Sequence, residues 1–263
     1  MIEVSNLYVK YAWRREHVLR GVSLRFTDKH IVLGPNGSGK TTLFRAIAGL
    51  VPISSGRILI DGLDVRDIYG VKGLLAINLS EVLSPLGVNA YDNLRLYMDL
   101  TDGDIDLALS ILEELGIDKQ ILVKRKPWEL SAGQRKAYGT AIALASKAKH
   151  VLLDEPFEQL DPARKTRLIK YLREYKGIIA INTHETWVIP VLREWSTYFI
   201  FEGRTYGPIQ TSKLLMANLV VGRRDDALLT FEAGGKVYSI VEAEVGEPLT
   251  KLLTLDKVYE LAV

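Results

Sequence analysis

The chain has 263 residues, of which 48 % are hydrophobic and 25 % charged, so it can fold as one large domain, with or without an appendage. Its net charge of +2 comes without a block of like charges, so no nucleic-acid partner is expected, and the absence of cysteine excludes disulfides and thiolate metal sites. The sequence begins without the apolar core of a signal peptide and has no uninterrupted run of about 18 apolar residues, so we expect any membrane role to depend on a partner.

The first sixty residues alternate between strand and helix patterns. Apolar residues alternate at 2–4 and 22–26, which predicts half-buried strands, and the apolar run 30–33 predicts a buried strand. A helix is expected from Lys40, because the apolar residues that follow it recur on one helical face. Residues 57–62 predict a further strand that ends in an Asp-Gly turn.

The middle of the chain, roughly residues 89–148, has mostly helical periodicity. The apolar runs 151–153 and 177–183 alternate with helices, as the strands of a parallel sheet do. Between these runs, Asp161 can cap a helix whose first residue is Pro162. The sequence therefore predicts an α/β fold with a parallel-sheet core, N-terminal antiparallel strands and an inserted helical subdomain.

The pattern changes again after residue 204. Apolar runs at 227–232 and 236–242 flank Ala-Gly-Gly and predict a β-hairpin. We therefore expect a main domain over residues 1–204 and a small β-containing appendage over residues 205–263. Such an appendage more often stabilises a fold or a dimer than it senses a ligand.

The segment GPNGSGKT, residues 34–41, satisfies the G-x-x-x-x-G-K-[ST] pattern of a phosphate-binding loop, with a strand before it and a helix after it. Glycines let backbone N–H groups point at phosphate oxygens, and the helix N-terminus adds positive potential. The ammonium of Lys40 suits the terminal phosphates, and the hydroxyl of Thr41 suits Mg²⁺. The predicted nucleotide-binding residues of this loop are Gly34, Asn36, Gly37, Ser38, Gly39, Lys40, Thr41 and Thr42.

Two carboxylates, Asp154 and Glu155, follow the apolar run VLL, and His184 follows the next one. Ligands of open parallel sheets bind beyond the carboxyl ends of the strands, where these side chains are expected. Asp154 suits a metal ion, and Glu155 is then placed to orient or deprotonate an attacking water. The other histidines, His17, His30 and His150, are expected at the surface or at strand edges.

Several motifs in this order resemble those of ATP-binding cassette (ABC) ATPases, over about residues 1–204. GPNGSGKTT is similar to the Walker A motif of that family, and LSAGQ, residues 130–134, to its signature. VLLDEP is similar to Walker B, EQLD to the D-loop and NTHE to the segment with the switch histidine. Tyr11 stands where the family places an aromatic residue that stacks on adenine.

The resemblance implies two cassettes that stack head to tail, so that the signature of one covers the ATP on the phosphate loop of the other. Ser131 offers a hydroxyl, Gly133 an unobstructed backbone and the following helix its N-terminal dipole, which together suit a second anion site. Gln134 completes the signature, whose usual second glycine is Ala132 here. By the same resemblance Asp154 is the Mg²⁺ partner, Glu155 the general base, His184 a contact of the γ-phosphate and Asp161 a link between the two sites.

One departure from the family concerns a glutamine that lies near Mg²⁺ and the attacking water. The nearest equivalent that can be placed in this sequence is Asn78, which keeps the amide but is one methylene shorter. Asn78 is therefore a predicted metal-site residue, with three alternatives open. The loop approaches more closely, the site turns over slowly, or the amide comes from another position.

The resemblance implies a cytoplasmic ATPase subunit that binds ATP and Mg²⁺ and drives a separate integral membrane transporter, to which it attaches peripherally. Its length and modest C-terminal extension are similar to those of cobalt-type and vitamin importers, whereas YDNLRLY is similar to segments of drug-export cassettes. A soluble ATPase of DNA repair or translation is a further alternative. It is disfavoured, because the chain has no room for a long coiled-coil insertion and holds a single cassette. The signature itself disfavours a phosphoryl-transferring kinase.

Overall fold

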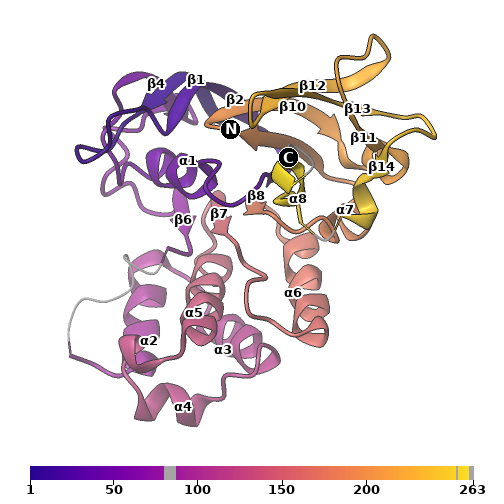
Figure 1. Cartoon of the computed structure of the whole chain (residues 1–263). Helices are drawn as coiled ribbons and strands as arrows, with labels where there is room; N and C mark the ends of the chain where they lie inside the picture. Colours follow the sequence, from indigo (N-terminus) through magenta and orange to yellow (C-terminus); the bar gives the residue numbers. More distant parts are fainter. Residues whose placement is uncertain (80–86, 253, 261–263) are drawn as a thin grey trace. The chain divides into compact units, whose positions relative to one another are not determined.

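The computed structural model describes residues 1–79, 87–252 and 254–260 (Figure 1). The chain divides into two compact units, which are described separately below. Unit one comprises Met1–Asp67 and Asn182–Val263, and unit two comprises Ile68–Ile181. Both units contribute to a mixed α/β fold with N-terminal antiparallel strands and a helical region, as the sequence predicts.

An antiparallel sheet opens unit one, with the strand order β2-β1-β4-β5. β1 lies between β2 and β4, and its Ile2 pairs with Phe26 on one side and with Ile60 on the other. All three side chains are fully buried, which confirms the half-buried strands predicted from the alternating pattern. The four strands are β1 (Ile2–Val9), β2 (Leu19–Phe26), β4 (Ser55–Ile60) and β5 (Leu63–Asp64).

The strand that precedes the phosphate loop is β3 (Lys29–Leu33), which pairs in parallel with β9 (Ser196–Phe201). The loop runs from β3 into α1 (Lys40–Ile47), so the predicted strand–loop–helix unit is confirmed. β9 pairs in turn with β10 (Arg204–Gln210) as an antiparallel neighbour. The core sheet of unit one therefore continues beyond residue 204, where the sequence pattern suggested a domain boundary.

A small antiparallel sheet with the order β12-β13-β11-β14 follows in unit one. The predicted hairpin is confirmed, since Ala233 of β12 pairs with Lys236 of β13 across the Gly-Gly turn. Phe231 stacks on Phe201 of β9, with ring centroids 3.9 Å apart, which joins this sheet to the core sheet. The strands are β11 (Asn218–Val221), β12 (Ala227–Ala233), β13 (Lys236–Val241) and β14 (Glu247–Pro248).

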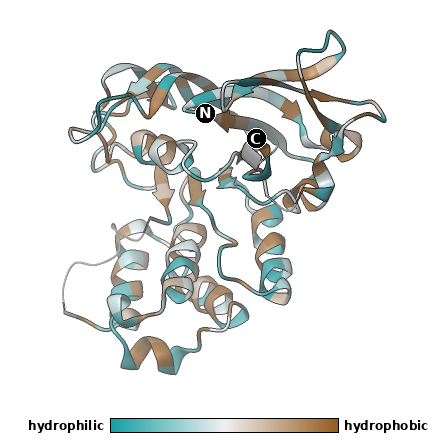
Figure 2. Cartoon of the chain, viewed as in Figure 1, coloured by the Kyte–Doolittle hydropathy of each residue, from teal (hydrophilic) through white to brown (hydrophobic). Residues whose placement is uncertain are grey.

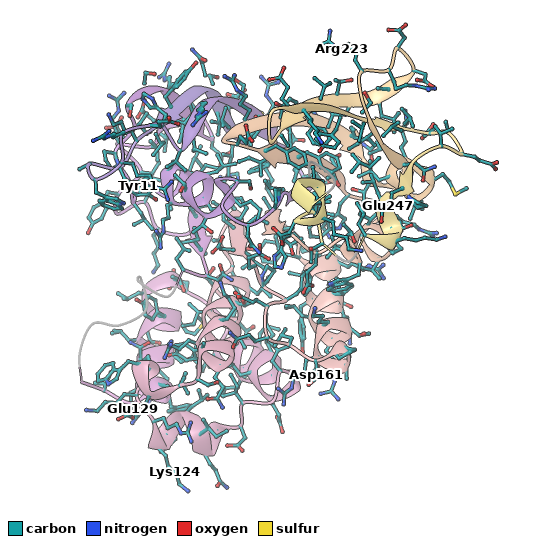
Figure 3. All side chains as sticks on the ribbon, viewed as in Figure 1. Tyr11, Lys124, Glu129, Asp161, Arg223 and Glu247 are labelled. Atoms are coloured by element: carbon teal, nitrogen blue, oxygen red, sulfur yellow. The ribbon has the colours of Figure 1, made fainter. Side chains whose placement is uncertain are left out.

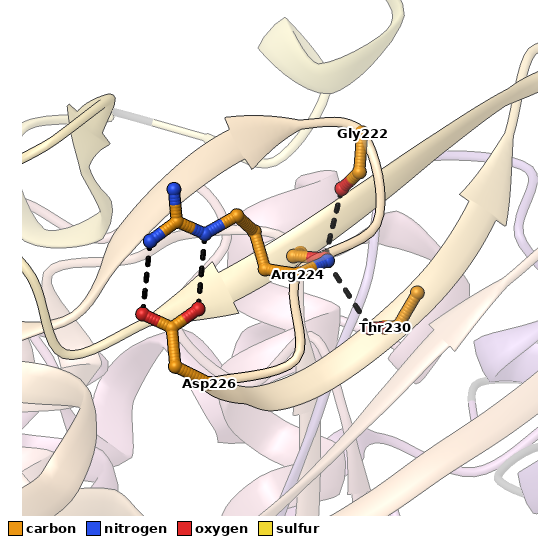
Figure 4. A network of polar contacts seen from close by, with 5 residues as sticks. Gly222, Arg224, Asp226 and Thr230 are labelled. Atoms are coloured by element: carbon orange, nitrogen blue, oxygen red, sulfur yellow. Dashed lines mark hydrogen bonds and ion pairs between the residues drawn. The ribbon is translucent and has the colours of Figure 1, made fainter.

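A polar network closes the turn between β11 and β12 (Figure 4). Arg224 donates to both carboxylate oxygens of Asp226, at 2.9 and 3.0 Å. The buried hydroxyl of Ser239 donates to the carbonyl oxygen of Gly222 at 2.8 Å and lies 3.2 Å from the Thr230 hydroxyl. These contacts satisfy the polar groups of the turn within the sheet, which is the arrangement expected of a structural element.

Short helices complete unit one around these sheets. They are α7 (Val188–Val191), the 3₁₀ helices η3 (Thr211–Met216) and η4 (Leu249–Lys251), and α8 (Lys257–Glu260).

Unit two holds three strands in the order β8-β7-β6 and most of the long helices. Buried β7 pairs in parallel with β6, and Leu75 faces His150. Figure 2 shows that the helices of unit two carry both hydrophobic and hydrophilic residues. The elements are β6 (Leu75–Ile77), α2 (Ala90–Thr101), α3 (Ile105–Glu114), α4 (Lys119–Lys124), η2 (Pro127–Glu129), α5 (Ala132–Ala145), β7 (His150–Asp154), α6 (Pro162–Glu174) and β8 (Ile178–Thr183), whose last two residues belong to unit one.

Side-chain caps start the main helices of unit two. In each case a side-chain oxygen accepts a hydrogen bond from a backbone N–H of the first helical turn. The capping residues are Asn89, Asp104, Asp118, Ser131 and Asp161. Such caps satisfy N–H groups that have no partner within the helix, and each stabilises a helix by about 1 kcal/mol. The predicted start of α6 at Asp161 and Pro162 is therefore confirmed.

Within the described ranges, no helix has the length and apolar character needed to cross a membrane. The division into a main domain over residues 1–204 and an appendage over residues 205–263 stays a prediction.

Candidate active site

The phosphate loop of unit one follows β3 directly and is anchored at its first residue. The Gly34 N–H donates to the carbonyl oxygen of Thr183 at 3.1 Å, and a Cβ at Gly34 would lie only 2.3 Å from the carbonyl oxygen of Ile200. Gly39 has a φ of 109°, a conformation that residues with a side chain rarely adopt. Both glycines of the motif are therefore required by the backbone, as the loop pattern predicts.

The side chain of Lys40 is buried and folds back over the loop. Its ammonium donates to the carbonyl oxygens of Gly34 at 2.8 Å and Pro35 at 3.0 Å, which places a positive charge at the centre of the loop. The hydroxyl of Ser38 is buried, and no residue in the described part of the chain hydrogen-bonds to it. A buried hydroxyl and a buried ammonium in the same loop fit a ligand with several acceptor oxygens, such as a polyphosphate.

An aromatic pair lies at the start of unit one. The Tyr11 hydroxyl lies 3.3 Å from the Thr42 hydroxyl of α1, so the ring is tied to the helix that follows the loop. Trp13 stacks on Tyr11, with centroids 4.7 Å apart and an interplanar angle of 21°. Figure 3 labels Tyr11. Trp13 is 78 % exposed, so this pair offers an aromatic surface to a base.

The end of β8 carries His184, whose carbonyl oxygen accepts a hydrogen bond from the Leu255 N–H at 3.0 Å. Asn36 of the phosphate loop contacts the same C-terminal segment. Its backbone N–H donates to one carboxylate oxygen of Asp256 at 2.7 Å, and its side-chain amide donates to the other at 3.1 Å. Sequence reasoning missed Asp256, because no local pattern indicates a contact between residues so far apart in the chain.

In unit two, Asp154 ends the buried strand β7 and is itself buried. Its N–H donates to the side-chain oxygen of Asn78 at 2.7 Å, and its carbonyl oxygen accepts from the Lys136 ammonium at 2.9 Å. The same ammonium lies 3.8 Å from a carboxylate oxygen of Asp154. The strand end is therefore held by Asn78, which directly follows β6, and by Lys136 of α5, whose positive charge accompanies the buried carboxylate.

Asn78 is 1 % exposed and uses its amide for contacts inside unit two. Besides accepting from the Asp154 N–H, it donates to the Thr140 hydroxyl at 3.1 Å and to the Asp154 carbonyl oxygen at 3.3 Å. These bonds link the end of β6 to β7 and to α5. The metal role assigned to Asn78 by resemblance stays a prediction, and the observed geometry supports a different role, proposed below.

Glu155 follows Asp154 with a φ of 45°, in the left-handed region that a residue with a side chain seldom occupies. Such a conformation costs on the order of 1–3 kcal/mol and is found most often at functional sites. The chain thereby turns sharply at the end of β7. Glu155 is half-buried and Asp154 is buried, and their roles as general base and metal ligand stay predictions.

The signature segment forms a capped helix start. The Ser131 hydroxyl oxygen accepts from the Gln134 N–H at 3.2 Å, and the Gln134 side chain accepts from the Ser131 N–H at 3.0 Å. This capping box leaves the hydroxyl hydrogen of the exposed Ser131 available to an acceptor. A Cβ at Gly133 would lie 3.1 Å from the side-chain oxygen of Gln159, so this position has little room for a larger residue.

Asp161 caps α6 and is labelled in Figure 3 at the start of that helix. Its carboxylate accepts from the Arg164 N–H at 2.9 Å. That hydrogen bond, followed by the positive charges of Arg164 and Arg167, holds the pKa of Asp161 below its ordinary value. The exposed carboxylate is therefore ionised near neutral pH.

The residues predicted to bind Mg²⁺ offer oxygen ligands. The described residues contain no group of three or more histidine, cysteine, aspartate or glutamate side chains that could hold a metal alone. Mg²⁺ keeps several waters and takes only one or two protein carboxylates together with substrate phosphates. The buried carboxylate of Asp154 and the Thr41 hydroxyl are the donor types that such an ion requires, so these residues fit the ion.

Comparisons with known proteins identify the family to which these motifs belong. The family model for ABC transporters matches residues 19–158. The taurine import ATP-binding proteins TauB of Shigella boydii serotype 4 and of Escherichia coli K12 are both 33 % identical over 193 residues, which cover 70 % of this chain and 74 % of theirs.

Solved structures extend the likeness to the whole chain. A chain assigned as a cobalt transport ATP-binding protein is 39 % identical, with a TM-score of 0.90, and the match covers 99 % of this chain and 100 % of that one. Another, cbiO1 from Clostridium perfringens, is 25 % identical with a TM-score of 0.60, over 81 % of this chain and 89 % of that one. The chain therefore belongs to the ABC transporter family, as an ATP-binding subunit that hydrolyses ATP.

Proposed function

We propose that this chain is the ATPase of a small-solute importer, in which two cassettes close on two ATP molecules and drive a separate membrane subunit. The observation that carries the proposal is the likeness, over the full length and including the C-terminal appendage, to a chain assigned to cobalt transport. The curated relatives, named for taurine import, also favour uptake over export. The solute that fits this evidence best is a small polar solute or a metal ion.

Each site residue has a proposed role in ATP hydrolysis. The phosphate loop binds the polyphosphate through its N–H groups and through Lys40, and Tyr11 with Trp13 takes the base. Thr41 and Asp154 would be the residues that hold Mg²⁺, and the ion would offset the charge of the phosphates. Glu155 orients the attacking water and accepts its proton, and His184 donates to the γ-phosphate.

The signature acts on the nucleotide of the second cassette in this proposal. The free hydroxyl hydrogen of Ser131, the N–H groups at the start of α5 and the dipole of that helix suit a phosphate that approaches from outside the chain. Gly133 and Gln134 shape this helix start, and Asp161 presents an ionised carboxylate to the partner cassette.

For Asn78 we propose a positioning role in place of direct metal ligation. Its amide bonds to the N–H and the carbonyl oxygen of Asp154, and its contact with Thr140 ties these groups to the signature helix. Together with Lys136, Asn78 would hold the metal carboxylate in place and link its position to α5. The side chain then needs no approach to the metal itself.

The partners and the location follow from this function. A second copy or a related cassette completes both sites, and an integral membrane subunit receives the motion. The chain would lie at the cytoplasmic face of the membrane, attached through that subunit. A drug-export cassette or a soluble ATPase of repair or translation remains the alternative, with less support from the relatives.

Co-purification tests the proposal directly. The chain is expressed together with the membrane proteins encoded beside its gene, and the membrane fraction is purified through a tag on one of them. We expect the chain to be retained and its ATPase rate to rise when a small solute such as Co²⁺ or taurine is supplied. A chain that hydrolyses ATP but binds no membrane protein from its neighbourhood would favour the soluble alternative.

A further inference from the structure

The last described stretches of the chain, residues 249–252 and 254–260, are packed firmly within unit one and are called the C-terminal segment. Leu249, Leu252, Leu255 and Val258 are each at most 1 % exposed. The Tyr238 hydroxyl donates to the carbonyl oxygen of Val258 at 3.2 Å, so the segment is anchored on the small sheet as well. Four buried apolar side chains in so short a stretch indicate that the segment stays docked.

The same segment is bonded to the strand end that carries His184. The Leu255 N–H donates to the carbonyl oxygen of His184 at 3.0 Å, and Thr254 forms a β-bridge with Glu185. The buried hydroxyl of Thr186 donates to the carbonyl oxygen of Leu252. The chain at the predicted switch histidine and directly after it is therefore held by the C-terminal segment.

Asp256 extends this contact to the phosphate loop. Its two carboxylate oxygens accept from the backbone N–H of Asn36 at 2.7 Å and from the Asn36 side-chain amide at 3.1 Å. Figure 1 shows α8, which begins at the next residue, beside the loop that leads into α1. Hydrogen bonds to a carboxylate are stronger than neutral ones, and two of them fix both position and orientation.

The part of the loop next to Asn36 needs such support. Gly37 has a φ of 76°, and a Cβ at this position would have no neighbouring atom within 4 Å. A glycine in open space is conformationally free, so its order must come from flanking contacts. The Asp256 carboxylate supplies such a contact directly before Gly37.

We propose that Asp256 is a positioning residue of the nucleotide site. It fixes the phosphate loop before ATP arrives, and its segment connects the loop to the strand end of His184. This inference rests on the proposed function, since it concerns the same site. A loop that is ordered in advance loses less conformational entropy when it binds a polyphosphate, and binds it more tightly.

The Asp256→Ala variant distinguishes two effects of the carboxylate on the affinity for ATP, its positioning of the loop and its negative charge. Loss of a carboxylate makes the site more positive, so charge alone would tighten the binding of a polyanion. If the carboxylate positions the loop, its loss weakens the binding of the polyanion. We expect Asp256→Ala to raise the Kd of ATP and of tripolyphosphate by about three- to tenfold each, because two charge-assisted hydrogen bonds that order the loop are lost.

Isothermal titration calorimetry of the full chain with each ligand, together with the thermal midpoint of every variant, decides the question. Asp256→Asn keeps one acceptor oxygen and should fall between Asp256→Ala and the parent. Lys251→Ala, an exposed change in the same segment, is the matched control and should bind like the parent. Tripolyphosphate has no base. An equal rise in the Kd of both ligands would therefore show that Asp256→Ala acts on the phosphate loop and not on the part of the site that binds the base.

The following results would overturn the inference. Tighter binding by Asp256→Ala would mean that the carboxylate competes with phosphate, and unchanged Kd values with a lowered thermal midpoint would mean that the contact only supports the fold. A parent chain that binds neither ligand would overturn the proposed function, and this inference with it. A parent that binds both, with an unchanged Asp256→Ala, would overturn the inference alone.

Discussion

At the scale of single residues, the hydrogen-bond partners of Asn78 favour one of two roles that an amide could have at this position. An amide near a metal site can ligate the metal, or it can hold the backbone of the residue that does. Here its oxygen accepts from the Asp154 N–H, and its nitrogen donates to Thr140 and to the Asp154 carbonyl oxygen. The sequence could indicate the amide, but it could not show these partners, which come from β7 and α5.

Asn78→Ala should affect both stability and metal affinity. The change leaves the buried N–H of Asp154 without its acceptor, which costs about 1–3 kcal/mol of unfolding free energy. The Mg²⁺ concentration that gives half-maximal ATPase activity should rise, because Asp154 loses its support. Urea denaturation and a Mg²⁺ titration measure these effects. Thr140→Val is the control, and its expected effect is smaller because it removes only one acceptor of the Asn78 amide. If Asn78→Ala had the stability and the Mg²⁺ dependence of the parent, the positioning role would be refuted.

The buried histidines correct an expectation from the sequence. His30 and His150 are 4 % and 1 % exposed within β3 and β7, whereas surface or strand-edge positions were expected. A single polar residue in an apolar strand gives no sign of its burial. Desolvation by burial lowers the pKa of His30 from 6.5 to about 4, although the negative charge of Asp28 acts in the opposite direction. The neutral ring accepts a hydrogen bond from the Thr27 N–H at 3.1 Å.

His30 should therefore make the protein less stable in acid. Its folded pKa is lower than its unfolded one, so the unfolded chain binds more protons between the two values. The contribution, on the order of 3 kcal/mol, is present above pH 6.5 and is lost as the pH falls towards about 4. Chemical denaturation at a series of pH values measures it. His30→Gln should lose stability less steeply over this window, and an identical slope would show that other groups dominate.

At the scale of elements, local signals predicted what local chemistry determines. Asp161 and Pro162 predicted the start of α6, and the Ala-Gly-Gly turn predicted the β12–β13 hairpin, because caps and turns depend on adjacent residues. The continuation of the core sheet into β10 and the contact of Asp256 with Asn36 were not predicted. Both are tertiary contacts, to which the neighbouring sequence gives no clue.

The signature helix carries the prediction that belongs to this scale. Ser131→Arg places a bulky side chain at the exposed start of α5, where the second cassette must present its nucleotide. We expect ATP hydrolysis to be abolished, while ATP affinity of the dilute monomer stays within about twofold of the parent, because the phosphate loop of the same chain is untouched.

Ser131→Ala is the control for this variant, because it loses the cap, worth about 1 kcal/mol, without adding bulk. Equilibrium binding of ATP and steady-state hydrolysis are measured for both variants. If Ser131→Arg lost ATP affinity as a monomer, the signature would act within its own chain and the two-cassette proposal would fail.

At the scale of the whole molecule, the fold class follows from the order of strand, loop and helix patterns along the chain. The division into two compact units does not follow from that order, because unit one contains both ends of the chain and unit two is the segment between them. The site residues divide between the units in the same way. The phosphate loop, Tyr11 and His184 lie in unit one, and Asp154, Glu155 and Ser131 lie in unit two. A cassette of this kind is expected to work through closure on ATP, which brings in residues of a second chain.

Glu155→Gln tests this account most directly. The amide keeps the shape of the carboxylate and allows ATP to bind, but it cannot accept the proton of the attacking water. Hydrolysis should fall by about a hundredfold or more, and the ATP-bound state should persist. Size-exclusion chromatography with ATP and Mg²⁺ should then show a dimer for Glu155→Gln and a monomer without nucleotide. A strictly monomeric elution with a parental rate of hydrolysis would contradict both the general base and the composite site.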